Sequence, residues 1–334
     1  MNSGKSNGCK FFGFGLFAML LAVYLSAEAQ QPKKIARVGY FFASTPAATA
    51  YNIEAFRHGV QELGHTEGKT FVLEVRYGEG RAEQFPEIAL ELVALKLDVI
   101  VAASDVAIAA VKRETQTIPI VMATSNEPVG TGLVASLAHP GGNVTGLSIL
   151  SAELSGKRLE LLREVVPGLS RVAFLWNPDV RGAVLDYRET EAAAGSLGLQ
   201  LQSVEVVRAE DLDRAFSVVT KERAQALIVP PLNPIAFGNR DQIATFVQKN
   251  KLPSIYAQRE YVDAGGLMSY GTSIPEMHRR AATYVDRILK GTKPADLPVE
   301  RPKKFELIIN LRTAKQIGLI IPPNVLARAD RVIK

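Results

Sequence analysis

The sequence is poor in the residues that most often build metal, disulfide and redox sites. It has one cysteine, Cys9, and four histidines, His58, His65, His139 and His278. A single cysteine excludes a disulfide framework and any CxxC motif, and the histidines lack the i, i+4 spacing of a metal-binding pair. We therefore expect no metal ion and no cofactor, and we assign the histidines to exposed or helix-surface positions.

The sequence also has little excess charge of one sign. Lys and Arg number 39 against 34 Asp and Glu, which gives a formal net charge of +5 at pH 7. Charges of both signs alternate along the chain, so it has no basic stripe of the kind that binds nucleic acid. The hydrophobic fraction of 47% is typical of globular proteins. A chain of 334 residues favours two domains over one.

Long apolar runs are confined to the N-terminus. Two lysines precede the apolar run Phe11–Leu25, and Ala27-Glu28-Ala29 follows it. This order is typical of a secretory signal peptide, here residues 1–29, cleaved after Ala29. The alternative is a membrane anchor, although a span needs roughly 20 apolar residues. Cys9 precedes the apolar run, so we do not expect lipidation. The prediction is a soluble, monomeric protein exported to a bacterial periplasm.

Beyond residue 30, apolar segments alternate with amphipathic ones. Residues 35–41, 98–103 and 118–123 are apolar runs typical of buried strands, and residues 51–63 have the apolar spacing of a helix. This alternation predicts an α/β fold with parallel sheets that are covered on both faces. The same order of segments recurs over residues 171–256, which predicts two similar, doubly wound lobes.

Three segments are expected to connect the lobes. They are His139–Gly146, with its Pro-Gly-Gly turn, the glycine-rich Gly265–Gly271, and the proline-rich Pro294–Pro302. Strand-like connections of this kind permit hinge bending without loss of core packing. The predicted lobes comprise residues 33–145 plus 273–298, and residues 146–272 plus 299–334.

Motifs for catalysis are missing from the sequence. Gly64–Thr70 lacks the spacing of a phosphate-binding loop and follows a predicted helix instead of a strand. Gly146–Leu150 lacks the second glycine of a nucleophile elbow. An exported hydrolase or isomerase is therefore the weaker alternative, and we predict that the protein is not an enzyme.

Several strings along the chain carry a resemblance to a known family. They include Pro140-Gly141-Gly142-Asn143-Val144-Thr145-Gly146 and Ala264-Gly265-Gly266-Leu267-Met268-Ser269-Tyr270-Gly271, with others at residues 118–121, 132–137, 157–162, 288–291, 294–298 and 304–310. Over residues 33–334 the chain resembles the uncharacterised ABC-transporter substrate-binding family that includes tryptophan- and tyrosine-binding members. The resemblance implies a type I periplasmic binding fold, with two doubly wound lobes joined by three crossings. It also implies a small-molecule ligand, and ABC permease subunits in the inner membrane as partners.

The cleft between two such lobes is the predicted binding site. Ligands of open α/β sheets bind beyond the carboxyl ends of the strands, and a ligand that contacts both lobes favours the closed state. Candidate ligand-binding residues follow the predicted strands or lie on the second crossing. They are Phe41, Ser44, Ser104, Thr124 and Asn126 of the first lobe, and Trp176, Asn177, Asn233, Tyr256, Glu260 and Tyr270 beyond it.

The types of these residues favour an amino-acid-like or small aromatic solute. Hydroxyl groups and helix N-termini suit a carboxylate, and Glu260 suits an ammonium group. Each residue also has a structural interpretation: Ser104 as a helix cap, Trp176 as a core residue, Glu260 as a solvated charge. A ligand-sensing receptor for a membrane signalling partner is the alternative function that the sequence leaves open.

Overall fold

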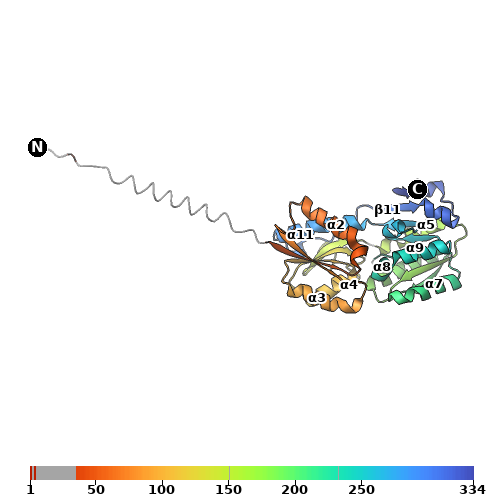
Figure 1. The fold of residues 1–334 in the computed structure, drawn as a ribbon, viewed down its shortest axis with the longest axis horizontal. Coiled ribbons are helices and arrows are strands. Elements are labelled where there is room, and N and C mark those ends of the chain that lie inside the picture. Colours follow the sequence, from red (N-terminus) through yellow and green to blue (C-terminus); the bar gives the residue numbers. More distant parts are fainter. Residues whose placement is uncertain (2–3, 5–34, 150, 232) are drawn as a thin grey trace.

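The computed structural model describes residues 1, 4, 35–149, 151–231 and 233–334. From residue 35 on, the chain forms two lobes, each with helices packed on both faces of a central sheet (Figure 1). Apart from Met1 and Gly4, the predicted signal peptide, with Cys9, lies outside the described residues. Within the described ranges, no helix combines the length and the apolar character that a membrane span requires.

Lobe 1 is a five-stranded parallel sheet in the order β2-β1-β3-β4-β5. Alternate side chains of its strands point to opposite faces, so Tyr40 packs against α2 and α11 and Phe41 packs against α3 and α4. Figure 1 shows these two helical pairs on opposite sides of the sheet. The elements are β1 (Ala36–Phe42), α2 (Pro46–Glu62), β2 (Phe71–Tyr77), η1 (Ala82–Gln84), α3 (Phe85–Ala94), β3 (Val99–Ala103), α4 (Asp105–Glu114), β4 (Ile120–Ser125), β5 (Val144–Ser148), α11 (Ile274–Leu289) and η4 (Pro294–Asp296).

Lobe 2 is a seven-stranded sheet in the order β12-β11-β10-β9-β8-β6-β7. One face is covered by α5, α6, α12 and α13, and the other by α7, α8, α9 and α10. The elements are η2 (Ala152–Leu154), α5 (Ser155–Val165), β6 (Arg171–Trp176), α6 (Arg181–Ser196), β7 (Gln200–Glu205), η3 (Ala209–Asp211), α7 (Leu212–Lys221), β8 (Ala226–Val229), α8 (Pro234–Gly238), α9 (Arg240–Lys249), β9 (Ser254–Tyr256), α10 (Glu260–Asp263), β10 (Met268–Gly271), β11 (Glu306–Asn310), α12 (Leu311–Ile317), α13 (Pro323–Leu326) and β12 (Arg331–Ile333).

The lobe 2 sheet departs from the all-parallel arrangement that the sequence predicted. Strands β10 and β11 are antiparallel, because the chain leaves lobe 2 after β10, adds α11 to lobe 1 and returns into β11 from the interlobe side. The α/β class and the two lobes agree with the sequence prediction.

The first two connections between the lobes begin later in the chain than predicted. Val144–Ser148 is not a crossing but strand β5, paired with β4 in lobe 1, so lobe 1 extends beyond residue 145. Met268–Gly271 is likewise strand β10 of the lobe 2 sheet. The third connection runs beside β5, since Ser148 N donates to Glu300 O at 3.0 Å and Glu300 N donates to Gly146 O at 3.0 Å.

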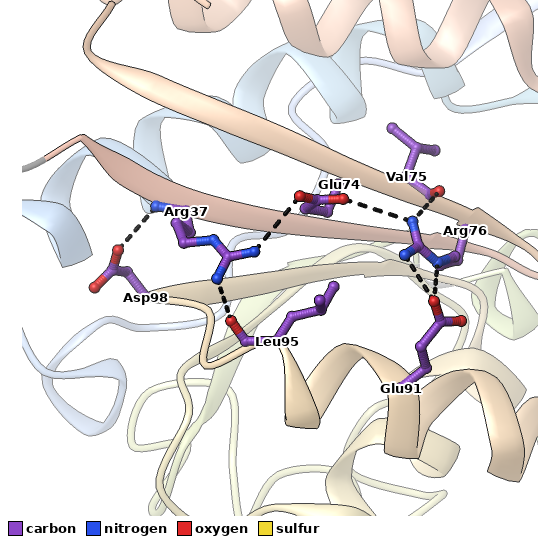
Figure 2. A network of polar contacts seen from close by, with 7 residues as sticks. All are labelled: Arg37, Glu74, Val75, Arg76, Glu91, Leu95 and Asp98. Carbon is purple, nitrogen blue, oxygen red and sulfur yellow. Dashed lines mark hydrogen bonds and ion pairs between the residues drawn. The ribbon is translucent and has the colours of Figure 1, made fainter. Parts of the chain in front are cut away.

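A polar network joins α3 to the edge of the lobe 1 sheet (Figure 2). Arg37, at the start of β1, donates its guanidinium to Leu95 O at 2.7 Å and its backbone N–H to Asp98 Oδ2 at 2.8 Å. Arg76 of β2 pairs with Glu91 of α3 at 2.7 Å. Exposed ion pairs contribute little to stability, so we assign this network to orienting α3 on the sheet.

Candidate ligand-binding site

A narrow cavity lies between the lobes, at the carboxyl ends of the strands. Lobe 1 contributes residues that follow β1 and β3, a residue of β4, and the first turns of α2 and α11; lobe 2 contributes residues that follow β8 and β9. The cavity has a volume of about 50 Å³, which is room for a few water molecules. A solute of amino-acid size would therefore have to enter while the lobes are further apart.

Five buried polar atoms at this cavity have no hydrogen-bond partner among the described residues. Most buried polar groups in proteins are paired, and leaving one unpaired costs about 1–3 kcal/mol. Five unpaired groups from both lobes around one cavity therefore indicate a site for a polar ligand. They are Ser44 Oγ, Asn52 Oδ1 and Ser104 Oγ of lobe 1, and Asn233 Nδ2 and Gln258 Oε1 of lobe 2.

The side-chain amide of Asn233 is oriented by the helix that it caps. Its Oδ1 accepts from the backbone N–H groups of Ile235 at 3.1 Å and Ala236 at 3.2 Å, at the N-terminus of α8. Because Oδ1 is occupied in this way, the unpaired Nδ2 is a donor. Lobe 2 therefore offers the cavity a fixed hydrogen-bond donor.

Ser104 has a strained backbone and does not act as a side-chain cap. It precedes α4 with φ 87° and ψ 147°, and its hydroxyl makes no capping bond. This region of φ/ψ space is nearly restricted to glycine, and a residue held there costs of order 1–3 kcal/mol. Such strain is concentrated at functional sites, so the ligand interpretation of Ser104 is favoured over the capping one.

His278 lines the same cavity, although the sequence assigned it to an exposed or helix-surface position. It lies on α11, is 1% exposed, and its Nδ1 contacts the Tyr40 hydroxyl. Burial lowers the pKa of His278 to about 3. Its helical neighbours Ala281, Ala282 and Val285 share its face of α11 and are buried with it. That apolar spacing is the signal in the sequence that would have placed His278 inside.

Four of the predicted site residues are brought together at the cavity. Ser44, Ser104 and Thr124 follow or end strands of lobe 1, and Asn233 follows β8 of lobe 2. Phe42, Asn52, Phe237, Gln258 and His278 also line it, and the sequence did not predict them.

Three predicted aromatic residues lie in the hydrophobic cores and do not line the cavity. Phe41 and Tyr256 are fully buried on the sheet faces that the helices cover. The Trp176 ring packs in the lobe 2 core, and its Nε1 donates to Ser203 Oγ at 2.8 Å. Strand alternation explains this outcome for Phe41, since its neighbour Phe42 points to the opposite face of the sheet and lines the cavity.

Three further predicted residues do not line the cavity. Asn177 Oδ1 accepts from Asp179 N at 2.9 Å in a turn. The carbonyl oxygen of Tyr270 accepts from Arg158 Nε at 2.9 Å. Glu260 lines a separate cavity between the lobes, beside Arg240. Burial raises the pKa of the Glu260 carboxyl, whose Oε2 has no partner among the described residues.

Asn126 joins the lobes beside the cavity. Its Nδ2 donates to Asp186 Oδ2 of lobe 2 at 3.1 Å, and its backbone N–H donates to Asp105 Oδ1 at 3.1 Å. Burial raises the pKa of Asp105 to about 6 and that of Asp186 to about 7. Burial also lowers the pKa of the nearby Arg158 to about 10. Two buried carboxyl groups from opposite lobes therefore accept from one residue, Asp105 from the backbone N–H of Asn126 and Asp186 from its side chain.

Comparisons with known proteins agree with this architecture. The family model described as ABC transporter substrate binding protein matches residues 41–333. A tyrosine-binding protein of Clostridioides difficile (strain R20291) is 25% identical over 267 residues, which are 80% of this chain and 76% of the relative.

Two solved structures are similar over 90% of this chain and 100% of their own. One is a conserved domain protein of Vibrio cholerae, with a TM-score of 0.84 and 28% identity. The other is an ABC domain from Streptococcus pneumonia in complex with L-Trp, with a TM-score of 0.84 and 26% identity. The predicted family and the two-lobed fold are thereby confirmed.

Proposed function

Because this chain belongs to the family of ABC transporter substrate-binding proteins, we propose that it captures an amino-acid-like or small aromatic solute between its lobes. Hinge closure holds the solute, and the closed protein delivers it to a membrane permease formed by other chains. The protein acts as a monomer in the periplasm and leaves the solute chemically unchanged.

The observation that carries this proposal is the set of unpaired polar atoms at the interlobe cavity. Ser44 and Ser104 belong to lobe 1, and Asn233 and Gln258 belong to lobe 2. A solute that hydrogen-bonds to both sets interacts more strongly with the closed state than with the open one. Its binding therefore shifts the protein toward closure.

The solute class is supported by the lining and by the relatives. Phe42 and Phe237 present aromatic rings from opposite lobes, which suits a planar apolar group between polar contacts. One relative is a tyrosine-binding protein, and one similar structure holds L-Trp.

A thermal-shift screen of the purified protein tests the proposal. L-tryptophan, L-tyrosine, aliphatic amino acids and sugars are compared, since a solute at 100 times its Kd adds about 2.7 kcal/mol to the free energy of unfolding. An amino acid or aromatic compound should raise Tm. A response to sugars alone would contradict the solute class, and turnover of the bound compound would contradict a purely binding role.

Two variants locate the site. Asn233→Asp keeps the oxygen that caps α8 but replaces the donor with a carboxylate oxygen, so it should repel a carboxylate solute. Asn310→Asp is the control for the changed cap, since Asn310 caps α12 through its Oδ1, at 3.1 Å from Thr313 N, and does not line the cavity. Its Nδ2 donates to Val262 O at 3.4 Å, so the free energy of unfolding of both variants is measured beside their affinity. Equal affinity of the two variants for the solute would show that Asn233 does not contact it.

Glu260 lines a separate cavity between the lobes, and Glu260→Gln tests whether its carboxyl is the partner of the solute's ammonium group. Weaker binding of L-tryptophan, with unchanged binding of an analogue that lacks the amine, would support the proposed role of Glu260. Unchanged binding of both compounds would show that Glu260 does not contact the ammonium group.

A further inference from the structure

Tyr40 and His278 form a buried pair at the wall of the cavity. The Tyr40 hydroxyl contacts His278 Nδ1. The His278 ring also stacks on Phe42, with ring centroids 5.6 Å apart and planes 25° apart. Contacts on its face and at one nitrogen thus fix the orientation of the imidazole.

The contact with Tyr40 decides which nitrogen of His278 carries the proton. Burial raises the pKa of Tyr40 well above its ordinary value, so the hydroxyl keeps its proton and needs an acceptor. His278 Nδ1 is the acceptor that the described residues offer to it. If Nδ1 carried the proton, the buried Tyr40 O–H would lose this acceptor, which is costly. A neutral imidazole that accepts at Nδ1 carries its proton at Nε2.

The other groups that line the cavity determine the surroundings of the His278 Nε2–H group. Within the described residues, the lining contains no Asp, Glu, Lys or Arg side chain. Ser44 and Ser104, on the same lobe as His278, offer two unpaired hydroxyls. No hydrogen bond to a described residue occupies His278 Nε2. This wall of the cavity is therefore rich in neutral donors.

We propose that His278 Nε2–H is a fixed donor that binds a carboxylate oxygen of the solute, and that Tyr40 is the residue that positions it. This inference deepens the proposed function and rests on it. An anion held by neutral donors needs no lysine or arginine in the cleft. The pKa of the His278 imidazole is about 3. From pH 5 to 9 the imidazole therefore stays neutral and keeps its single proton.

Nitrogen NMR of the ligand-free full chain tests the tautomer without any solute. The protein is labelled with ¹⁵N-histidine, and the His278 signals are assigned by their loss in His278→Leu. Protonation at Nε2 alone is expected, unchanged between pH 5 and 8, with a mixture of tautomers in Tyr40→Phe. Protonation at Nδ1 in the wild-type protein, or titration near pH 6.5, would overturn the proposal.

A double cycle tests the contact with the carboxylate. L-tryptophan and tryptamine, which lacks the carboxylate, are titrated calorimetrically into wild-type, His278→Gln and His278→Leu proteins. Loss of a hydrogen bond to a charged group corresponds to roughly 10- to 100-fold in Kd. The preference for L-tryptophan should fall by that factor in His278→Leu and by less in His278→Gln, whose amide retains a donor.

The two measurements separate the possible failures. An equal loss of affinity for both compounds in His278→Leu would mean a structural role and would overturn the contact with the carboxylate. If the wild-type protein binds neither compound, the solute class proposed above is wrong, and the tautomer measurement alone decides whether His278 presents the donor.

Discussion

The side chain of Asn126 in lobe 1 donates to the carboxylate of Asp186 in lobe 2 across 3.1 Å, and each residue is 1% exposed. This bond crosses from one lobe to the other, so it forms when the lobes close and is replaced by water when they part. Closure therefore has a favourable contact of its own, separate from any contact with a solute.

Removing the amide should weaken solute binding without touching the cavity. Asn126→Ala leaves the buried Asp186 carboxylate without this donor in the closed state, whereas water solvates it in the open state. A hydrogen bond to a charged group contributes about 1.5–3 kcal/mol. At pH 8, above the Asp186 pKa of about 7, Kd should therefore rise roughly 10- to 100-fold by calorimetry. Asn250→Ala, at the exposed end of α9, is the control and should bind as the wild type does. Equal Kd values in the two variants would mean that the bond contributes nothing to closure.

Solute affinity should fall as the pH rises from 5 to 8. In the closed state the pKa of Asp186 is about 7 and that of Asp105 about 6, against an ordinary value of 3.8. Opening hydrates both groups and returns their pKa values toward 3.8, so closure takes up protons. This favours closure at acidic pH, and the advantage is lost as the pH rises through 6 and 7. Calorimetric Kd values over this range measure the slope.

The matched variant for this pH dependence is Asp186→Asn. Its amide oxygen still accepts from Asn126, but the side chain no longer titrates, so the slope of log Kd against pH should flatten. The other charged groups near Asp186 are Asp105, Glu127 and Arg158. Of these, Asp105 should supply residual slope near pH 6, and Glu127, whose pKa burial raises to about 7, should supply residual slope near pH 7. The same slope in the variant and in the wild type would exclude Asp186 as the titrating group.

The fold could be predicted because the signals for it are local and repeated. Apolar runs such as residues 98–103 specify buried strands in any context, and most lie where the structure has them. The errors came where a strand carries small or polar residues. Gly146 and Ser148 belong to β5, whose pairing with β4 depends on a partner about 25 residues away.

The site could be predicted only in part, because it depends on which way each side chain points. Ser44 and Ser104 were found because they lie just past strand ends. Phe41 and Tyr256 lie at strand ends too, but pleating turns them into the cores. Gln258 and His278 reach the cavity through the relative placement of the lobes and of α11, which no local pattern encodes.

Two substitutions at Ser104 should separate the effect of its strained backbone on stability from the effect of its hydroxyl on solute binding. Ser104→Gly relieves a conformation with φ 87° and should raise the free energy of unfolding by about 1 kcal/mol. Ser104→Ala keeps the strain. Both variants lose the unpaired hydroxyl, so both should bind the solute more weakly. Urea unfolding and calorimetry measure the two effects. A Ser104→Gly protein with unchanged affinity would exclude the hydroxyl from the site.

Gly182 should be required for the lobes to close fully. It is the second residue of α6 in lobe 2, and a Cβ atom added there would lie 2.4 Å from Asp105 Oδ2 of lobe 1. Asp105 cannot retreat easily, because Ser125 and Asn126 both donate to its other oxygen. Gly182→Ala should therefore hold the lobes apart and weaken solute binding about tenfold or more, which corresponds to about 1.4 kcal/mol.

The control for Gly182→Ala lies on the same helix. An added Cβ at Gly195 meets nothing within 4 Å, so Gly195→Ala should bind the solute normally and should gain about 0.5–1 kcal/mol of helix stability. Small-angle X-ray scattering with saturating solute reports closure directly. The radius of gyration should decrease for Gly195→Ala as it does for the wild type, and should decrease less for Gly182→Ala. Full compaction of the Gly182→Ala protein would show that Asp105 yields, and that contact at this point does not limit closure.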